Sequence, residues 1–268
     1  MTRYAISDIH GYYNLYREVK SRLKPHDILY VLGDCADRGP SGWKTLRAIL
    51  TDPQCILLLG NHELMLRDVI DEWFKIVEEK TKDAEDCELT PREIADEEII
   101  YTSVYELLLM NGGEFTFWDW RHEEDLEYWK KRLDSLPVEI QLFDTEKPII
   151  LTHAGYTPWK KPTDIEDLVW DREHFFDKWL EEDSSIIIHG HTPNPFLYEY
   201  LIEGPQLYHS CYYMDSFKSL GLDKTGAELW DITYSDGHKI CIDPGTVVTH
   251  RGILINLETL EQEMVKFV

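Results

Sequence analysis

Cysteine is scarce in this chain, with five in 268 residues, at positions 35, 55, 87, 211 and 241. The number is odd and no two stand at CxxC spacing, so neither a disulfide framework nor a cysteine-based zinc site is expected. The first predicted strand begins at residue 3, which leaves no room for a signal peptide. We therefore expect reduced thiols and a cytoplasmic location.

Basic residues are also few. Lys and Arg total 27 against 51 Asp and Glu, for a formal net charge of −24. Such a surface repels nucleic-acid backbones and anionic lipid, so neither is expected as a partner. The longest apolar runs fall far short of the roughly 20 residues that cross a bilayer. The same acidity repels phosphorylated substrates, so a site for them needs local positive charge from metals or arginines.

Hydrophobic residues make up 43% of the chain, enough for a sizeable core. Residues 3–60 read as β-α-β-α-β, with strands at 3–6, 28–32 and 55–59 and helices at about 12–23 and after Pro40-Ser41. Each strand leads into polar side chains: Asp8 and His10 after the first, Asp34, Asp37 and Arg38 after the second, Asn61 and His62 after the third. Because parallel strands bring their carboxyl ends to one edge of a sheet, this pattern predicts a metal site.

From residue 64 to about 136 the pattern becomes helical, with 9 basic and 21 acidic side chains. Thr90-Pro91-Arg92-Glu93 is typical of a capping box, and its helix should run to the stop signal at Asn111-Gly112-Gly113. A further helix is predicted over about 123–136. We interpret this stretch as a helical insertion in a single domain spanning 1–268. Three of its tryptophans, Trp118, Trp120 and Trp129, are expected in the core, with a pocket lining as the alternative.

Strand patterns return after Pro137. Strands are predicted at 138–143, 148–152 and 186–188, and closing strands at 239–242 and 246–257. A helix is predicted over about 165–181, and residues 203–238 show no clear periodicity. The second and third of these strands lead into His153 and into His189-Gly190-His191.

Five blocks in this order resemble the calcineurin-like metallophosphoesterases: Asp8-x-His10-Gly11, Gly33-Asp34-x-x-Asp37-Arg38-Gly39, Gly60-Asn61-His62-Glu63, His153-Ala154-Gly155 and Gly190-His191-Thr192. The Asp-Arg-Gly and Asn-His-Glu blocks are most similar to the phosphoprotein phosphatase branch in its small bacterial form. Ile242-Asp243-Pro244-Gly245 extends the match towards the last strands. The resemblance implies an α/β (or α+β) fold, a two-sheet β-sandwich flanked by helices.

The resemblance also implies roles for individual residues. Asp8, His10 and Asp34 would hold one divalent metal, and Asp34, Asn61, His153 and His191 the other, with Asp34 as the bridge. Arg38 and Arg172 would bind phosphate oxygens, and His62, oriented by Asp37, would be the general acid. The competing interpretation makes His62 a metal ligand. Mn²⁺ is the expected metal, with Fe or Zn²⁺ as alternatives, since all three suit mixed carboxylate and imidazole ligands.

Two histidine-block details refine this picture. Many metallophosphoesterases carry a further ligand two residues after the His of the Gly-His block, where this chain has Pro193. The coordination site of the first metal should therefore be more open to water. The resemblance favours His191 as the ligand, so we expect His189, two residues before it, near the centre but not as a ligand. Cys35, between two site carboxylates, is expected to be a buried small side chain.

Three functions remain open from the sequence. The first is hydrolysis of phosphate monoesters by a metal-bound hydroxide, most simply on phosphoserine or phosphothreonine proteins. The second is hydrolysis of dinucleoside polyphosphates such as diadenosine tetraphosphate. The third, which the intact site residues disfavour, is a non-catalytic scaffold. The insertion would either cap the cleft and restrict substrate size or lie remote from it.

Overall fold

The computed structural model describes residues 1–82, 89–177, 183–197, 232–235 and 237–268. Within these ranges the strands form two five-stranded sheets. In the described residues no helix is long and apolar enough to span a membrane.

The first sheet has the strand order β10-β9-β1-β2-β3. Its parallel part consists of β1 (Arg3–Ile6), β2 (Ile28–Val31) and β3 (Cys55–Leu57). β9 (Arg251–Asn256) runs antiparallel to β1, and β10 (Gln262–Lys266) pairs antiparallel with β9. The sheet thus joins the two ends of the chain.

The second sheet has the order β4-β5-β6-β8-β7. β5 (Ile149–Thr152), β6 (Ile186–His189) and β8 (Lys239–Cys241) are parallel. β4 (Glu139–Leu142) and β7 (Ile232–Tyr234) pair antiparallel at the two edges.

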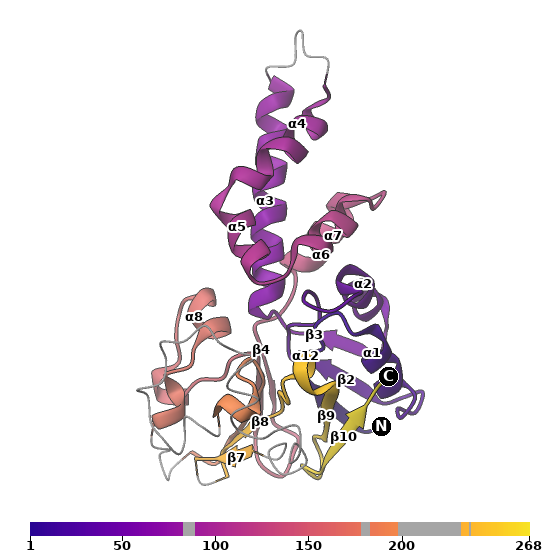
Figure 1. The fold of residues 1–268 in the computed structure, drawn as a ribbon. Helices are drawn as coiled ribbons and strands as arrows, with labels where there is room; N and C mark the ends of the chain where they lie inside the picture. The colour runs from indigo at the N-terminus through magenta and orange to yellow at the C-terminus, as the bar shows by residue number, and fades with distance from the viewer. Residues whose placement is uncertain (83–88, 178–182, 198–231, 236) are drawn as a thin grey trace.

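The two sheets pack face to face, as predicted. Side chains alternate along β2, so that Tyr30 enters the core between the sheets while Leu29 and Val31 enter the core on the outer face. Facing Tyr30 across the sandwich are aliphatic residues such as Ile188 and Ile240. Helices α1 (Tyr13–Lys20) and α2 (Gly42–Thr51) cover the outer face of the first sheet, and α8 (Ile165–Trp170) packs against the second (Figure 1).

The insertion is a group of five α-helices that extends from one end of the sandwich (Figure 1). They are α3 (Asn61–Lys82), α4 (Pro91–Glu98), α5 (Ser103–Met110), α6 (Glu114–Arg121) and α7 (Leu126–Asp134). Trp120 and Trp129 are buried in their core, as expected, and Trp118 is half-buried with its Nε1 donating to the Tyr105 hydroxyl at 3.0 Å. The Trp129 ring meets Trp43 of α2 at 5.3 Å, which ties the insertion to the sandwich.

Several predicted elements were wrong in extent. The capping box at Thr90 is present, but the helix that it starts ends at Glu98. A 3₁₀ turn (Ile99–Tyr101) follows, and the Thr102 hydroxyl then caps α5 by accepting the N–H of Tyr105 at 3.3 Å. The sequence analysis also missed α6, β7 and β10. A threonine that can cap a new helix competes with continuation of the old one, because its hydroxyl satisfies an N–H that the helix would otherwise bond.

Two further predictions need correction. The helix expected at 165–181 ends at Trp170, because Asp171 is extended, and a 3₁₀ turn (His174–Phe176) follows; residues 178–182 lie outside the described part. The closing strand expected at 246–257 begins only at Arg251. Left-handed backbone at Gly245 and His250 encloses one helical turn, α12 (Thr246–Thr249), ahead of it. Most of 203–238 also lies outside the described residues.

Candidate metal centre

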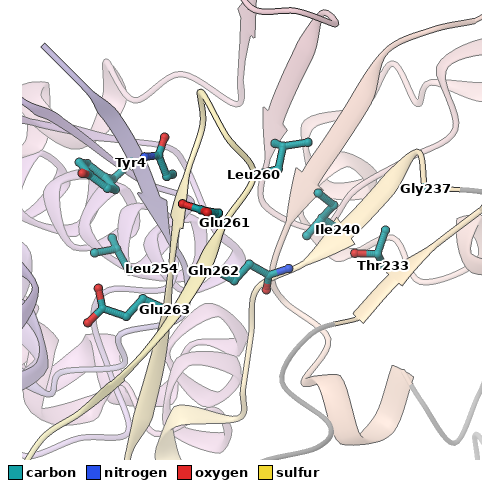
Figure 2. A pocket seen from close by; sticks show the side chains of 10 residues that line it. Tyr4, Thr233, Gly237, Ile240, Leu254, Leu260, Glu261, Gln262 and Glu263 are labelled. Atoms are coloured by element: carbon teal, nitrogen blue, oxygen red, sulfur yellow. The ribbon is translucent and has the colours of Figure 1, made fainter.

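A pocket of about 690 Å³ opens between strands of the two sheets (Figure 2). Thr233 and Ile240 line one side, and Leu254, Gln262 and Glu263 are among the residues on the other. No Lys, Arg or His stands among the described residues that line it. Without a cation it is a poor site for phosphate, and the candidate residues gather elsewhere.

The candidate residues meet where strands of both sheets end. Asp8 and His10 follow β1, Asp34 follows β2, and Asn61 begins α3 directly after β3. From the second sheet, His153 follows β5 and His191 follows β6. All six side chains are buried, with between 0% and 6% of each residue exposed. The structure therefore brings together all six residues predicted as metal ligands.

Asp34 lies at the centre of this set. It belongs to two groups whose possible ligand atoms fall within 4.8 Å of one another, one with His10 and His62 and one with His153 and His191. Asp34 Oδ1 is 3.4 Å from His153 Nε2. Asp34 Oδ2 is 3.8 Å from His62 Nε2 and 3.9 Å from His10 Nε2. One carboxylate oxygen thus faces each group, which is the arrangement that a bridging ligand requires.

Asn61 and Asp8 complete the two groups. Asn61 Oδ1 is 2.9 Å from both His153 Nε2 and His191 Nδ1. Asp8 Oδ1 is 3.8 Å from His10 Nε2, and Asp8 Oδ2 accepts hydrogen bonds from the His191 N–H at 2.9 Å and from the Ser7 hydroxyl. Ser7 had no role in the sequence analysis; its hydroxyl orients the Asp8 carboxylate.

Buried polar atoms in the centre fit divalent cations. Among the described residues, Asp8 Oδ1, His62 Nε2 and His191 Nε2 are buried without a hydrogen-bond partner. Each such atom costs about 1–3 kcal/mol when its bonding capacity is unused. Burial lowers the pKa of His10 and of His191 well below the usual value, which keeps the imidazoles neutral and able to ligate. Burial, with the charges of Asp8 and Glu63, raises the pKa of Asp34, a shift that a bound cation would oppose.

The backbone at the centre is strained. Non-glycine residues rarely adopt positive φ, and each instance costs on the order of 1–3 kcal/mol. Hydrogen bonds between loops sustain this conformation, such as the one from His10 N–H to the Asp34 carbonyl at 2.9 Å. Positive φ occurs at Asp8 (53°), His10 (46°), Asp34 (52°), Asp37 (63°), Arg38 (59°) and His191 (66°). Strained residues that cluster in this way are typical of functional sites.

His62 and Asp37 form a close pair. His62 Nδ1 lies 2.7 Å from Asp37 Oδ2, so one proton is held between them. Burial lowers the pKa of His62 and raises the pKa of Asp37 to about 7. The contact fixes the ring so that Nε2 lies 3.8 Å from Asp34 Oδ2. That position suits either a proton donor beside the metals or a ligand, the two alternatives left by the sequence.

The two arginines lie at the edge of the centre. Arg38 Nη1 is 3.2 Å from His10 Nε2. Arg172 Nε donates to the Thr192 hydroxyl at 3.2 Å, next to His191. Both guanidinium groups thus lie beside residues predicted as metal ligands; that they bind phosphate oxygens stays a prediction. His189 faces away, with Nε2 2.8 Å from the Tyr234 hydroxyl, and Cys35 is buried with its Sγ donating to Glu63 at 3.3 Å.

The insertion borders the centre through the turn between α5 and α6. The Gly112 carbonyl accepts the Arg38 N–H at 3.0 Å, and the Thr116 hydroxyl accepts the Asp37 N–H at 3.3 Å. A Cβ at Gly113 would lie 2.7 Å from Asp37 Oδ2, so only glycine allows this approach. The sequence analysis identified this turn only as a helix stop. The far end of α3 and α4 extend away from the sheets (Figure 1). The insertion is therefore not remote at its base; whether it restricts substrate size stays a prediction.

Comparison with known proteins gives one family match and several related proteins. The family model described as calcineurin-like phosphoesterase matches residues 1–230. The chain is 31% identical over 162 residues to a protein of Proteus mirabilis named bis(5'-nucleosyl)-tetraphosphatase, symmetrical; the alignment covers 59% of this chain and 46% of that protein. The chain thus spans about half the length of this relative.

Two further similarities are to proteins named as serine/threonine phosphatases. The chain is 27% identical over 181 residues to serine/threonine-protein phosphatase 2 of Salmonella typhimurium, covering 63% of this chain and 67% of that protein. A solved serine/threonine phosphatase from Saccharomyces cerevisiae matches with a TM-score of 0.52 and 12% identity, over 100% of this chain and 80% of that chain. At that identity the structural match shows the fold alone.

Proposed function

This chain belongs to the calcineurin-like phosphoesterase family, and from that premise we propose that it is a phosphoester hydrolase that acts on phosphate monoesters of serine and threonine in proteins. Two divalent metals, with Mn²⁺ as the expected ion, would be held by Asp8, His10, Asp34, Asn61, His153 and His191. The observation that carries this proposal is Asp34, whose two oxygens face two separate groups of imidazoles.

The chain's own residues supply the other requirements of the reaction. When bound, the metals would neutralise phosphate charge and activate a water molecule. Arg38 and Arg172 would bind the remaining phosphate oxygens and hold phosphorus in place, because a guanidinium donates two parallel hydrogen bonds to such a group. His62, oriented by Asp37, would give a proton to the departing oxygen.

A pocket beside Arg172 favours a protein substrate. It has a volume of about 600 Å³, and Trp170, which lines it, meets the His191 ring at 5.8 Å. Four acidic side chains and two basic ones, Lys160 and Arg172, also line this pocket. The acidic ones are Asp167, Asp171, Glu173 and Asp177. An acidic wall repels the polyphosphate chain of a dinucleotide more than it repels a neutral or basic peptide.

Hydrolysis of diadenosine tetraphosphate is the second candidate. The observation in its favour is the similarity to the Proteus mirabilis protein, whose name describes this activity. The two candidates share the same centre and differ only in what lies beyond the scissile phosphate, so the substrate itself must be tested.

Metal dependence is the first testable consequence. We expect a chelator to abolish hydrolysis of p-nitrophenyl phosphate and added Mn²⁺ to restore it better than Fe²⁺ or Zn²⁺, because carboxylate and amide oxygens at a first site open to water suit Mn²⁺. Elemental analysis of the active protein should give two Mn²⁺ per chain. One metal or none in a fully active sample would contradict the binuclear centre.

Substrate preference is the second testable consequence of the proposed function. We expect kcat/KM to be higher for phosphoserine and phosphothreonine peptides than for diadenosine tetraphosphate, because of the acidic pocket. Neutralising it with Asp167→Asn and Glu173→Gln should narrow the difference, whereas Glu127→Gln, on the exposed face of α7, should not. Faster hydrolysis of the dinucleotide by the unaltered protein would establish the second candidate instead, and hydrolysis of neither, with metals bound, would favour a scaffold.

A further inference from the structure

The Asn61-His62-Glu63 block contains a side chain that the proposed mechanism does not use. Glu63 is completely buried in the first turn of α3. Its neighbours in sequence, Asn61 and His62, both face the metal centre. A buried carboxylate in such a position requires compensating contacts, because burial without them is strongly unfavourable.

The contacts of Glu63 are with the loop that carries Asp34. Glu63 Oε2 accepts the N–H of Asp34 at 2.7 Å and that of Gly60 at 3.1 Å. Glu63 Oε1 accepts the N–H of Cys35 at 2.9 Å and that of Ala36 at 3.4 Å, and Cys35 Sγ also donates to it. All five groups are donors, so both carboxylate oxygens must act as acceptors.

The contact between the loop and α3 is reciprocal. Asp34 Oδ1 accepts the N–H of His62 at 3.0 Å, so the Asp34 side chain holds the start of the helix. Glu63 in turn holds the Asp34 backbone, as a capping box does within a single helix. Gly60 makes this close approach possible, since a Cβ there would lie 2.4 Å from Asp34 Oδ1.

Asp34 requires this support because of its geometry. Its φ is 52°, in the left-handed region that a non-glycine residue rarely adopts. From this backbone its oxygens reach imidazoles from both sheets, His153 Nε2 at 3.4 Å and His10 Nε2 at 3.9 Å. A rotation of the Asp34 backbone towards an ordinary conformation would withdraw the carboxylate from one group or the other.

We propose that Glu63 is a positioning residue of the metal centre, whose carboxylate fixes the backbone of Asp34 so that the Asp34 side chain can serve both metals. This inference rests on the proposed metal centre. Glu63 contacts neither substrate nor metal in this account. Partners that orient metal ligands typically change metal affinity by about 10- to 100-fold when they are replaced.

The test is Mn²⁺ retention by Glu63→Gln. The substitution keeps the size of the side chain but puts an NH₂ group against backbone N–H donors. Full-length protein, loaded with Mn²⁺, is dialysed against increasing chelator, and the Mn²⁺ retained per chain gives the affinity. We expect Glu63→Gln to bind Mn²⁺ about 10- to 100-fold more weakly than the unaltered protein.

Leu66→Ala provides the matched control. Leu66 is buried in the next turn of α3 and packs in the hydrophobic core, so its truncation lowers the melting temperature but removes none of the hydrogen bonds between Glu63 and residues 34–36. We expect this variant to retain Mn²⁺ like the unaltered protein. Equal loss of Mn²⁺ from Leu66→Ala and Glu63→Gln at matched melting temperatures would reduce the role of Glu63 to general stability and overturn the proposal.

Two other outcomes separate this inference from the function that it rests on. Two Mn²⁺ bound by the unaltered protein and held equally well by Glu63→Gln would overturn the role of Glu63 alone. No Mn²⁺ uptake by the unaltered protein would overturn the metal centre and this role with it. If Glu63→Gln does not fold, hydrogen exchange of the unaltered protein decides. The backbone amides of residues 34–36 should be protected from hydrogen exchange. If they exchange as fast as the amides of an open loop, the proposal is wrong.

Discussion

Asp34→Asn is expected to lose phosphoesterase activity to background and to lose most of its bound metal. The amide has one oxygen where the carboxylate has two, so it can serve the His10 group or the His153 group but not both. It also lacks the negative charge that balances two cations in a buried site. The measurement is kcat on p-nitrophenyl phosphate, with metal content determined by elemental analysis on the same samples.

Arg38→Ala is the comparison for this variant. It removes charge-assisted hydrogen bonds to the substrate worth about 1.5–3 kcal/mol, or roughly 10- to 150-fold in kcat/KM. The metals should stay bound, because Arg38 is not among the proposed ligands. Wild-type turnover and metal content in Asp34→Asn would show that the bridging assignment is wrong.

His62→Asn is expected to separate two classes of substrate. A serine alkoxide is a poor leaving group and requires a proton as it departs, whereas p-nitrophenolate leaves without one. General-acid catalysis contributes about 10²–10⁴-fold where it is needed. We therefore expect kcat for a phosphoserine peptide to fall by that factor in His62→Asn, while kcat for p-nitrophenyl phosphate falls far less.

Asp37→Asn should show the same bias in a weaker form. Asp37 Oδ2 lies 2.7 Å from His62 Nδ1, so its replacement disturbs the orientation and charge of the imidazole but leaves the ring in place. The competing interpretation makes His62 a metal ligand, in line with its position in the group of His10 and Asp34. If His62→Asn lowers kcat equally for both substrates and also loses bound metal, His62 is a metal ligand and not the general acid.

Much of the fold could be predicted because it rests on local patterns. The apolar run before each site block identified strands at the right places, and the capping box at Thr90 identified a helix start. The errors came where two local signals compete. Thr102 starts a new helix within a stretch whose apolar pattern continues, and residues 246–249 form a helical turn although their β-branched side chains favour a strand.

The residues predicted as metal ligands could be identified without coordinates, Asp8, His10, Asp34 and Asn61 from their place after strands and His153 and His191 from the resemblance to a family. Asp, His and Asn after successive apolar strands can be identified without coordinates, because parallel strands of one sheet must end at a common edge. The separation of His189 from His191 could not be predicted in this way, because residues two apart in a strand share a face. β6 ends at His189, and His191 has a φ of 66°, so His189 contacts Tyr234 while His191 contacts Asn61.

How these residues are grouped depends on the tertiary structure. Asp34 meets His153 and His191, which lie more than a hundred residues further along the chain, through contacts between loops of two sheets. Two further contacts also join segments that are distant in sequence. Glu63 holds the backbone of Asp34, and the Gly112-Gly113 turn approaches Arg38 and Asp37. Local sequence encodes backbone preference and burial. Which oxygen faces which imidazole depends on close packing between segments that are distant in sequence, and no local pattern records it.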